Sequence, residues 1–439
     1  MSAPDRLIVT PGGRLTGTLT VPGDKSISHR AVMFGAIARG ETVIEGCLMG
    51  DDVRATINAF RAMGVAIEAH DDGRVVIDGR GADALREPEH ALDMGNSGTS
   101  IRLLTGLLAG LGIRAQLGGD ASLNRRPMRR VTDPLALMGA DIATTDAGTP
   151  PLRIRSRAPL HGIRYELPVA SAQVKSAILL AGLNASGETH VVERLPSRDH
   201  TERMLRGFGV HVDVQGHTIS LRGGQTLAGT RISVPGDISS AAFFLVGAAM
   251  SEGASLRLEN IGMNPTRTGV IDILRLMGAD IELVAERTAG AEPVADIVVR
   301  GRRLHGVDIP AALVPSAIDE FPALFIAAAN AEGTTRLGQA DELRHKESDR
   351  IDVMASGLHE LGVEATALDD GIVIAGRPGA LGGGAIDSRG DHRIAMAFAV
   401  AGLCATAPIE LTGCTAIATS FPGFVATARR AGMDIAAAP

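Results

Sequence analysis

The sequence predicts an α/β fold of two domains, each made of three copies of a βαβαβ-type unit, six units in all. The first observation is a helix that begins with a polar, charged or Gly/Ser-rich turn, continues through small apolar residues and precedes a short β-like segment. This pattern occurs six times, at 24–40, 95–112, 171–187, 237–253, 319–333 and 391–405.

The second observation is a helix that ends in an apolar residue followed by glycine, and one such helix follows each helix of the first kind. The glycines are Gly64, Gly139, Gly209, Gly278, Gly362 and Gly432. They are separated by 75, 70, 69, 84 and 70 residues, so one unit is about seventy residues long. Solenoid repeats are usually shorter, and the units therefore indicate whole α/β layers.

A third observation places the domain limits. The motif Pro-Gly-Asp occurs at 22–24 and again at 235–237, each time before a helix. Because 439 residues are too many for one ordinary core, we interpret the two motifs as crossings between domains. We predict an inserted domain at 22–236 and a discontinuous domain at 1–21 plus 237–439. By symmetry, we expect the helix starts of the two domains to face one cleft.

Composition excludes several classes of function. Aromatic residues make up 3% of the chain, with no Trp and a single Tyr165, and the formal net charge is −7. Nucleic-acid binders need stacking platforms and basic surfaces, so we expect no nucleic-acid partner. The longest apolar run, 241–250, is too short to span a bilayer. Neither zinc-ligand spacing nor a phosphate-binding P-loop occurs, so we expect no metal and no membrane association.

The cysteines and the first residues indicate the compartment. Cys47, Cys404 and Cys414 form no CxxC pair, and an odd number of cysteines suits a reducing environment. Residues 1–6 have no signal-peptide or transit-peptide character. We therefore expect a cytoplasmic protein.

The stretch 21–30 is the strongest candidate for an anion site. Asp24 is placed to cap a helix that carries Lys25, Ser26 and Arg30 on its first turns. A helix N-terminus offers free N–H groups and the positive end of the dipole, which favour anions. The plainer alternative is a capped, solvent-exposed helix start with two surface cations.

The other helix starts add chemistry of the same kind. The run 95–102 is rich in Gly, Ser and Thr, and 125–130 contains four arginines. Lysine occurs only at positions 25, 175 and 346, all in or beside helix starts. This placement indicates that these sites need an ammonium group. The alternative is that the three lysines lie there by chance. Cations suit a substrate that carries phosphate, and carboxylates beside Lys suit proton transfer.

Each of these motifs also has a structural alternative. Lys346, Glu347 and Arg350 fit a solvated helix face with i,i+3 and i,i+4 pairs. Residues 391–393 fit a helix cap with a surface His392. The patch 125–130 fits a solvated turn, and 95–98 fits a tight turn.

Taken together, these residues resemble one family, the 5-enolpyruvylshikimate-3-phosphate synthases, also called 3-phosphoshikimate 1-carboxyvinyltransferases. The resemblance covers nearly the whole chain. It rests on PGDKSISHR (22–30), GNSGTSIRLL (95–104), GDASLNRRPMRR (119–130), SAQVKSAILLAGL (171–183), SRDHTERM (197–204), IDEFPAL (318–324), LRHKESDR (343–350), GDHRIAMA (390–397) and TSFPGF (419–424). The forms SAQVKSA, RPMRR and TSFPGF are similar to the family's second sequence class.

The resemblance implies an inside-out α/β barrel in two domains, the enolpyruvyl transferase fold. It implies transfer of the enolpyruvyl group of phosphoenolpyruvate to the 5-hydroxyl of shikimate 3-phosphate, with release of phosphate. This reaction lies on the shikimate pathway to chorismate and the aromatic amino acids. No cofactor and no metal are implied, and we expect a monomer.

The resemblance also implies roles for individual residues. The shikimate 3-phosphate contacts would be Lys25, Ser26, Arg30, Ser171, Ala172, Gln173, Arg198, Asp319 and Lys346. The phosphoenolpyruvate contacts would be Lys25, Gly98, Arg126, Gln173, Arg350 and Arg393. Asp319 would be the base for the 5-hydroxyl, Glu347 the acid for the methylene carbon, and Lys25 a third catalytic group, with His392 and Asn96 as further candidates.

Two positions bear on how far the resemblance extends. Many family members have a Lys just before the Phe-Pro near the C-terminus, whereas Thr419 and Ser420 precede Phe421 here. Gly98 occupies a position at which an alanine methyl crowds the inhibitor glyphosate, so we expect this chain to bind glyphosate.

Two rival functions share the fold. One is the sister transferase that acts on UDP-N-acetylglucosamine, which typically uses a Cys in the loop corresponding to 119–130; this loop contains none. The other is a non-catalytic phosphometabolite-binding protein. Simple anion binding does not need the carboxylates of Asp319 and Glu347, which disfavours it.

Overall fold

The computed structural model describes residues 4–156 and 159–438, and residue contacts divide the chain into two units. One unit is Met1–Pro22 with Pro235–Pro439, and the inserted unit is Gly23–Val234. The predicted limits of the inserted domain, 22 and 236, differ from these by one and two residues. The assignment of these units as two folding domains stays a prediction.

Six sheets are present among the described residues, three in each unit. Those of the inserted unit run in the order β14 (Arg231–Ser233), β3 (Arg39–Glu45), β5 (Val75–Arg80), β4 (Ala66–Ala69); β6 (Leu92–Asp93), β7 (Ala115–Gly118), β9 (Leu152–Ile154), β8 (Ile142–Ala143); and β10 (Arg164–Glu166), β11 (Glu188–Val192), β13 (Thr218–Arg222), β12 (Val212–Gln215). In each sheet the first two strands are parallel and the other pairs are antiparallel.

The discontinuous unit repeats this arrangement. Its sheets are β2 (Thr16–Leu19), β15 (Ser255–Gly262), β17 (Glu292–Arg300), β16 (Asp280–Ala289); β21 (Gly384–Asp387), β22 (Ile409–Thr412), β1 (Leu7–Thr10), β23 (Asp434–Ala437); and the three-stranded β18 (Thr334–Leu337), β20 (Gly371–Ala375), β19 (Glu364–Leu368). Beside β18, parallel bridges at His305 and Asp308 take the place of a fourth strand. The common order of strands shows that the described chain contains six copies of one βαβαβ-type repeat.

The chain crossings explain why two sheets take a strand from far away in the sequence. β2 lies before the first crossing and pairs in parallel with β15, whereas β14 lies before the second crossing and pairs in parallel with β3. Within the discontinuous unit, Asp237 N donates to Pro22 O at 2.9 Å, which joins the two segments at the crossing.

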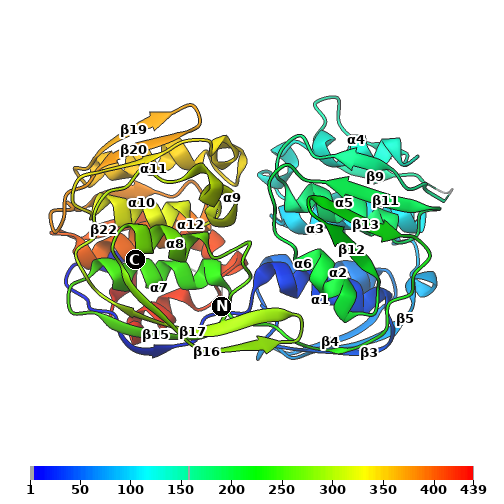
Figure 1. The fold of residues 1–439 in the computed structure, drawn as a ribbon, viewed down its shortest axis with the longest axis horizontal. Helices are drawn as coiled ribbons and strands as arrows, with labels where there is room; N and C mark the ends of the chain where they lie inside the picture. The colour runs from blue at the N-terminus through cyan, green and yellow to red at the C-terminus, as the bar shows by residue number, and fades with distance from the viewer. Residues whose placement is uncertain (1–3, 157–158, 439) are drawn as a thin grey trace. The chain divides into compact units, whose positions relative to one another are not determined.

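Helices of the first kind form the cores. They are α1 (Lys25–Ile37), α3 (Gly98–Leu111) and α5 (Ala172–Gly182) in the inserted unit, and α7 (Ile238–Met250), α10 (Phe321–Ala329) and α12 (His392–Ala401) in the other. Every residue of α7 and α10 is buried, as expected for helices that are apolar on all sides. In each unit the sheets surround these helices (Figure 1).

Helices of the second kind are amphipathic. They are α2 (Asp51–Ala62), α4 (Arg129–Leu137), α6 (His200–Gly207), α8 (Gly269–Leu276), α11 (Arg350–Glu360) and α13 (Phe424–Ala431), and a single turn, α9 (Val314–Ala317), precedes α10. The predicted glycine follows each of the six, with φ between +73° and +107°. This left-handed conformation costs glycine little, so the apolar residue–Gly pairs correctly marked the helix ends.

Close helix packing in the inserted unit also depends on glycine. A Cβ atom at Gly106 of α3 would lie 2.1 Å from the carbonyl oxygen of Ala177 in α5, and one at Gly110 would lie 2.6 Å from that of Ala181. The two helix backbones are therefore in direct contact. This contact brings the N-terminal ends of α3 and α5 close together.

Candidate functional site

Hydrogen bonds bring the starts of α1, α3 and α5 together in the inserted unit. Gln173, at the start of α5, accepts from Arg102 and donates to Thr99 Oγ1 at 3.1 Å, and both partners belong to α3. Arg30 of α1 donates to Ser176 of α5 at 2.8 Å. The predicted residues that gather here are Lys25, Ser26, Arg30, Asn96, Gly98, Arg126, Ser171, Ala172 and Gln173, which we call the cationic cluster.

Lys25 is paired with a carboxylate that sequence reasoning missed. Its ammonium forms an ion pair with Asp52 in the first turn of α2, and the two side chains are 19% and 6% exposed. The ammonium is therefore held in place while part of the side chain stays accessible. An acidic residue in the first turn of a neighbouring helix was the available signal, but such residues are common for dipole reasons alone.

Gly98 faces two guanidinium groups. A Cβ atom there would lie 3.0 Å from Arg126 Nη1 and 3.1 Å from Arg102 Nη1. Arg126 also donates to Asn96, whose amide group donates to Asp120 at 2.7 Å. Arg126 is only 8% exposed, which rules out the alternative of a fully solvated turn at this residue.

The start of α5 offers backbone donors. Ser171 caps the helix by accepting from Val174 N at 3.5 Å. The N–H groups of Ala172 and Gln173 donate to no group in the described part of the chain, which leaves them available to an anion. Arg198 is half-buried in the loop before α6, and Thr201 of that helix accepts from Arg30 at 2.7 Å.

Lys175 does not belong to this cluster. Its side chain is 1% exposed, and its ammonium lies 2.9 Å from Glu193 and 2.8 Å from Glu202. Burial alone would lower the pKa of Lys175, but Glu202 and Glu193 raise it overall. The ammonium is needed here as a buried counter-charge, so the rarity of Lys did not by itself identify a substrate contact.

Arg350 is the centre of a second group of residues, in the discontinuous unit. Its side chain is 1% exposed, and it donates to Asp391 Oδ2 at 2.9 Å, to Glu347 Oε2 at 2.6 Å and to Asp319 Oδ1 at 3.4 Å. These carboxylates raise the pKa of Arg350 although burial alone would lower it. Burial alone would raise the pKa of Asp391, but Arg350 lowers it overall.

Asp319 is surrounded by cations. Lys346 Nζ lies 3.5 Å from its Oδ1, Arg393 Nη2 lies 3.8 Å from its Oδ2, and Arg393 Nη1 donates to its backbone oxygen at 2.8 Å. The side chains of Asp319, Lys346 and Arg393 are 14%, 21% and 13% exposed. We call Asp319, Lys346, Glu347, Arg350, His392 and Arg393 the mixed cluster.

Two structural alternatives for this unit are wrong. Helix α11 begins at Arg350, so Lys346 and Glu347 precede it and do not form a helix face. Asp391 does cap α12, but His392 is 5% exposed and is not a surface residue.

A buried His29 links the helices of the cationic cluster. Its Nδ1 atom lies 2.8 Å from Thr56 Oγ1 of α2, which lies 2.7 Å from Ser100 Oγ of α3. Burial, and then the charges of Lys25 and Arg30, lower the pKa of His29 well below its ordinary value of 6.5. A neutral His29 adds no further charge to the site.

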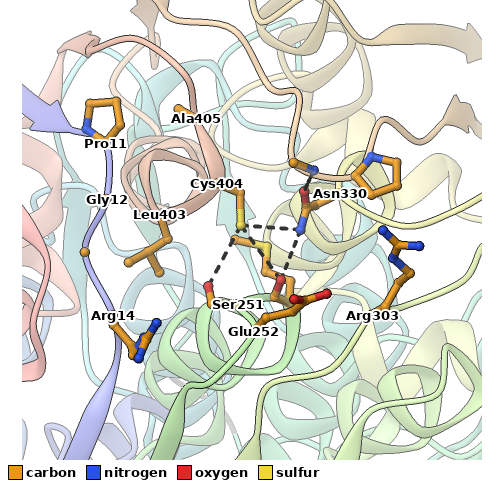
Figure 2. A pocket seen from close by; sticks show the side chains of 14 residues that line it. Pro11, Gly12, Arg14, Ser251, Glu252, Arg303, Asn330, Leu403, Cys404 and Ala405 are labelled. Atoms are coloured by element: carbon orange, nitrogen blue, oxygen red, sulfur yellow. Dashed lines mark hydrogen bonds between the residues drawn. The ribbon is translucent and has the colours of Figure 1, made fainter.

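A cavity lies apart from the predicted site residues. This cavity of about 550 Å³ lies in the discontinuous unit at the carboxyl ends of three core helices, and it is lined by Met250, the last residue of α7, and by Asn330 and Cys404, which follow α10 and α12. Figure 2 shows Asn330 and Cys404 among the side chains that line it. Its central amide is already engaged, because Asn330 donates to Met250 O and Cys404 Sγ and accepts from Gly379 N. None of the predicted site residues lines it.

Within 4–156 and 159–438, no group of three or more His, Cys, Asp or Glu side chains is placed to hold a metal ion. Among the described helices, none alone is long and apolar enough to cross a bilayer, although segments 311–317 and 321–329, bent by 120°, meet that test as a pair.

Comparison with known proteins gives a consistent family. Residues 9–427 match the family model described as EPSP synthase (3-phosphoshikimate 1-carboxyvinyltransferase). Proteins named 3-phosphoshikimate 1-carboxyvinyltransferase from Halorhodospira halophila and Methylococcus capsulatus are 61% and 59% identical, each over 97% of this chain and 96% and 97% of their own length.

Solved structures agree with the fold. An EPSP synthase from Acinetobacter baumannii is 55% identical, covers 98% of this chain and 99% of its own, and superposes with a TM-score of 0.88. The enolpyruvyl transferase NikO from Streptomyces tendae has a TM-score of 0.80 at 19% identity, over 99% of both chains, which supports the fold alone. The predicted α/β enolpyruvyl transferase fold is confirmed.

His29 should make the protein acid-sensitive. In the unfolded chain it titrates near pH 6.5, whereas in the folded protein it stays neutral, so its contribution to stability is present above that pH and is lost as the pH falls. We predict that the free energy of unfolding, measured in urea, falls for both proteins when the pH is lowered from 7.5 to 5. The fall should be about 1–2 kcal/mol smaller for His29→Asn than for the wild type. The exposed His217→Asn is the control, and equal pH dependence of His29→Asn and wild type would contradict the prediction.

Proposed function

Since the chain belongs to the EPSP synthase family and carries out the 3-phosphoshikimate 1-carboxyvinyltransferase reaction, we propose that residues of both clusters act in one enolpyruvyl transfer. The substrates are phosphoenolpyruvate and shikimate 3-phosphate, and the products are 5-enolpyruvylshikimate 3-phosphate and phosphate. The observation that supports this proposal is the chemistry within each cluster: uncommitted helix N–H groups and guanidinium groups in the cationic cluster, and the carboxylates of Asp319 and Glu347 beside cations in the mixed cluster.

The cationic cluster supplies most of the proposed shikimate 3-phosphate contacts. Both substrates carry phosphate and carboxylate groups, while the protein has a net charge of −7, so binding requires a local concentration of donors. The donors of this cluster are the side chains of Lys25, Ser26, Arg30 and Gln173, with Ser171 and the backbone of Ala172. Arg198, in the loop before α6, is proposed as a further contact. From the mixed cluster, Lys346 and Asp319 complete the set.

Phosphoenolpyruvate would be held by guanidinium groups, which match carboxylate and phosphate oxygens in a bidentate manner. Arg126 beside Gly98, and Arg393 beside Asp319, are 8% and 13% exposed and suited to this role. Arg350 is more enclosed, so a ligand would have to share it with Glu347 and Asp319. Lys25 and Gln173 complete the proposed contacts.

The residue before Phe421 differs from the Lys of many family members. Ser420 is 7% exposed, and its hydroxyl has no hydrogen-bond partner in the described residues. We propose that Lys25, Arg126 and Arg393 carry the phosphate contacts in this chain.

The chemistry requires one proton acceptor and one proton donor. Asp319, which lies beside Lys346, Arg350 and Arg393, takes the proton of the 5-hydroxyl, and that oxygen bonds to C2 of phosphoenolpyruvate. Glu347, in its protonated form, gives a proton to C3, which completes a tetrahedral intermediate. The C2–O bond to phosphate then breaks, C3 returns its proton to Glu347, and the proton taken from the hydroxyl leaves with phosphate. Lys25 stabilises the negative charge, and His392 and Asn96 are secondary candidates.

The compartment and the assembly state are proposals as well. Cys47, Cys404 and Cys414 are free thiols, and burial raises the pKa of each of them. We propose a cytoplasmic, monomeric enzyme without cofactor, metal, nucleic-acid or membrane partner.

The first test is phosphate release from phosphoenolpyruvate with either acceptor. Release should occur with shikimate 3-phosphate and not with UDP-N-acetylglucosamine. Asp319→Ala and Glu347→Gln should each lower kcat by about 10²–10⁴-fold, because each removes a proton-transfer group. Asp308→Ala, whose side chain is 88% exposed, is the control. Release only with the nucleotide sugar, or full activity in both variants, would overturn the proposal.

The second test concerns Gly98. The methyl group of Gly98→Ala would press on Arg126 and Arg102, at 3.0 and 3.1 Å, so both guanidinium groups must move. We expect KM for phosphoenolpyruvate to rise about tenfold, and the inhibition constant of glyphosate to rise further, while KM for shikimate 3-phosphate stays within about twofold. Gly207→Ala, where a Cβ meets nothing within 4 Å, should change none of these constants. An unchanged KM for phosphoenolpyruvate in Gly98→Ala would show that Gly98 is not at its site.

A further inference from the structure

A buried carboxylate next to the proposed base has no role in the proposal above. The side chain of Glu320 is fully buried, although it directly follows Asp319 and precedes α10. Its Oε1 atom accepts a hydrogen bond from Ser239, at the start of α7, and lies 3.8 Å from both Arg267 Nη2 and Arg393 Nη1. We propose that Glu320 is a positioning residue that holds Arg393 in the orientation that binds phosphoenolpyruvate; this inference rests on the binding role proposed for Arg393.

Glu320 is itself fixed on the side away from Arg393. Arg267 is 3% exposed, donates to Ser239 Oγ at 2.6 Å and to Asp237 Oδ1 at 3.1 Å, and Asp237 is the N-cap of α7. The Glu320 carboxylate is therefore held by a buried guanidinium and a hydroxyl that belong to another repeat. A group anchored in this way can orient a neighbouring side chain because it does not move with it.

The distance to Arg393 suits orientation rather than capture. At 3.8 Å the Glu320 oxygen attracts the guanidinium without forming a normal hydrogen bond, whereas Arg393 Nη1 donates to Asp319 O at 2.8 Å. Most donors of Arg393 thus stay available for a ligand. Anchoring Glu320 also fixes the adjacent backbone oxygen of Asp319, which is the group that Arg393 contacts.

The internal repeat shows how this arrangement relates to the substrate site. Asp237-Ile238-Ser239 repeats Asp24-Lys25-Ser26, so Ser239 corresponds to Ser26, for which we propose a substrate contact, while the lysine is replaced by isoleucine. In this copy the hydroxyl binds the carboxylate of Glu320 instead of an external anion. The helix start of the fourth repeat therefore organises the site and does not bind substrate.

The test compares the two Michaelis constants in Glu320→Gln, which keeps the shape of the side chain and removes its charge. We expect KM for phosphoenolpyruvate to rise about tenfold or more while KM for shikimate 3-phosphate stays within about twofold. Glu332→Gln, just past the other end of α10 and with a 70% exposed side chain, is the matched control and should change neither constant. Equal changes in both constants, or none, would overturn the inference.

A double-mutant cycle separates orientation from general loss of packing. In an Arg393→Lys background, Glu320→Gln should add little to the defect in KM for phosphoenolpyruvate, because the group that it orients is already altered. Additive effects would overturn the inference. If Glu320→Gln does not fold, Ser239→Ala is the second variant; it removes the hydrogen bonds that the Ser239 hydroxyl makes with Glu320 and Arg267. It should raise the same constant by a smaller factor and add little in the Arg393→Lys background; no rise would contradict the inference.

The outcome is distinguishable from failure of the proposed function. If the wild type releases no phosphate with shikimate 3-phosphate, the proposed function fails. If it does so and Glu320→Gln keeps the wild-type constants, only the role of Glu320 fails.

Discussion

The ion pair between the buried Arg350 and Asp391 is the interaction on which the mixed cluster depends. Both side chains are essentially inaccessible to water, and neither charge is stable there without the other. The pair joins the first residue of α11 to the N-cap of α12, and the remaining donors of Arg350 reach Glu347 and Asp319. Two carboxylates for which we propose proton-transfer roles are thus held by one guanidinium. Removing that guanidinium would leave the buried charge of Asp391 uncompensated.

The internal repeat explains why charged and capping side chains gather at the N-terminal ends of the buried helices. A βαβαβ-type unit places the N-terminus of a buried helix beside those of its two neighbours, and each terminus contributes N–H groups and a capping side chain. Six copies of this start have diverged. At α1, α3 and α5 the side chains that surround it are mainly cationic, whereas the hydroxyl near the start of α7 is occupied by the internal carboxylate of Glu320.

Much of the fold could be predicted from the sequence because its signals are local. A glycine in the left-handed conformation ends each amphipathic helix, and Asp24, Ser97, Ser171, Asp237 and Asp391 accept hydrogen bonds as N-caps. Many of the candidate residues lie at or beside these starts, and the resemblance to a family implied the role of each candidate. The comparisons confirm the family and the fold, while the role of each residue stays a prediction.

The sequence could not show which side chains meet, either between the two helices of one repeat or across repeats. Lys25 pairs with Asp52, Gln173 with Arg102, and Ser239 with Glu320, and these partners are separated by 27, 71 and 81 residues. No periodicity encodes such contacts, since they depend on the packing of neighbouring units. For the same reason Lys175 was grouped with the other two lysines, although Glu193 and Glu202 enclose it.

The most direct test of the account follows solvent deuterium into phosphoenolpyruvate. If Glu347 protonates C3 and the step is reversible, wild-type enzyme in D₂O with shikimate 3-phosphate should place deuterium on the methylene carbon, as measured by mass spectrometry of recovered phosphoenolpyruvate. Glu347→Gln should abolish this exchange while still binding both substrates. Exchange at the wild-type rate in Glu347→Gln would contradict the central claim that this carboxyl group carries the proton.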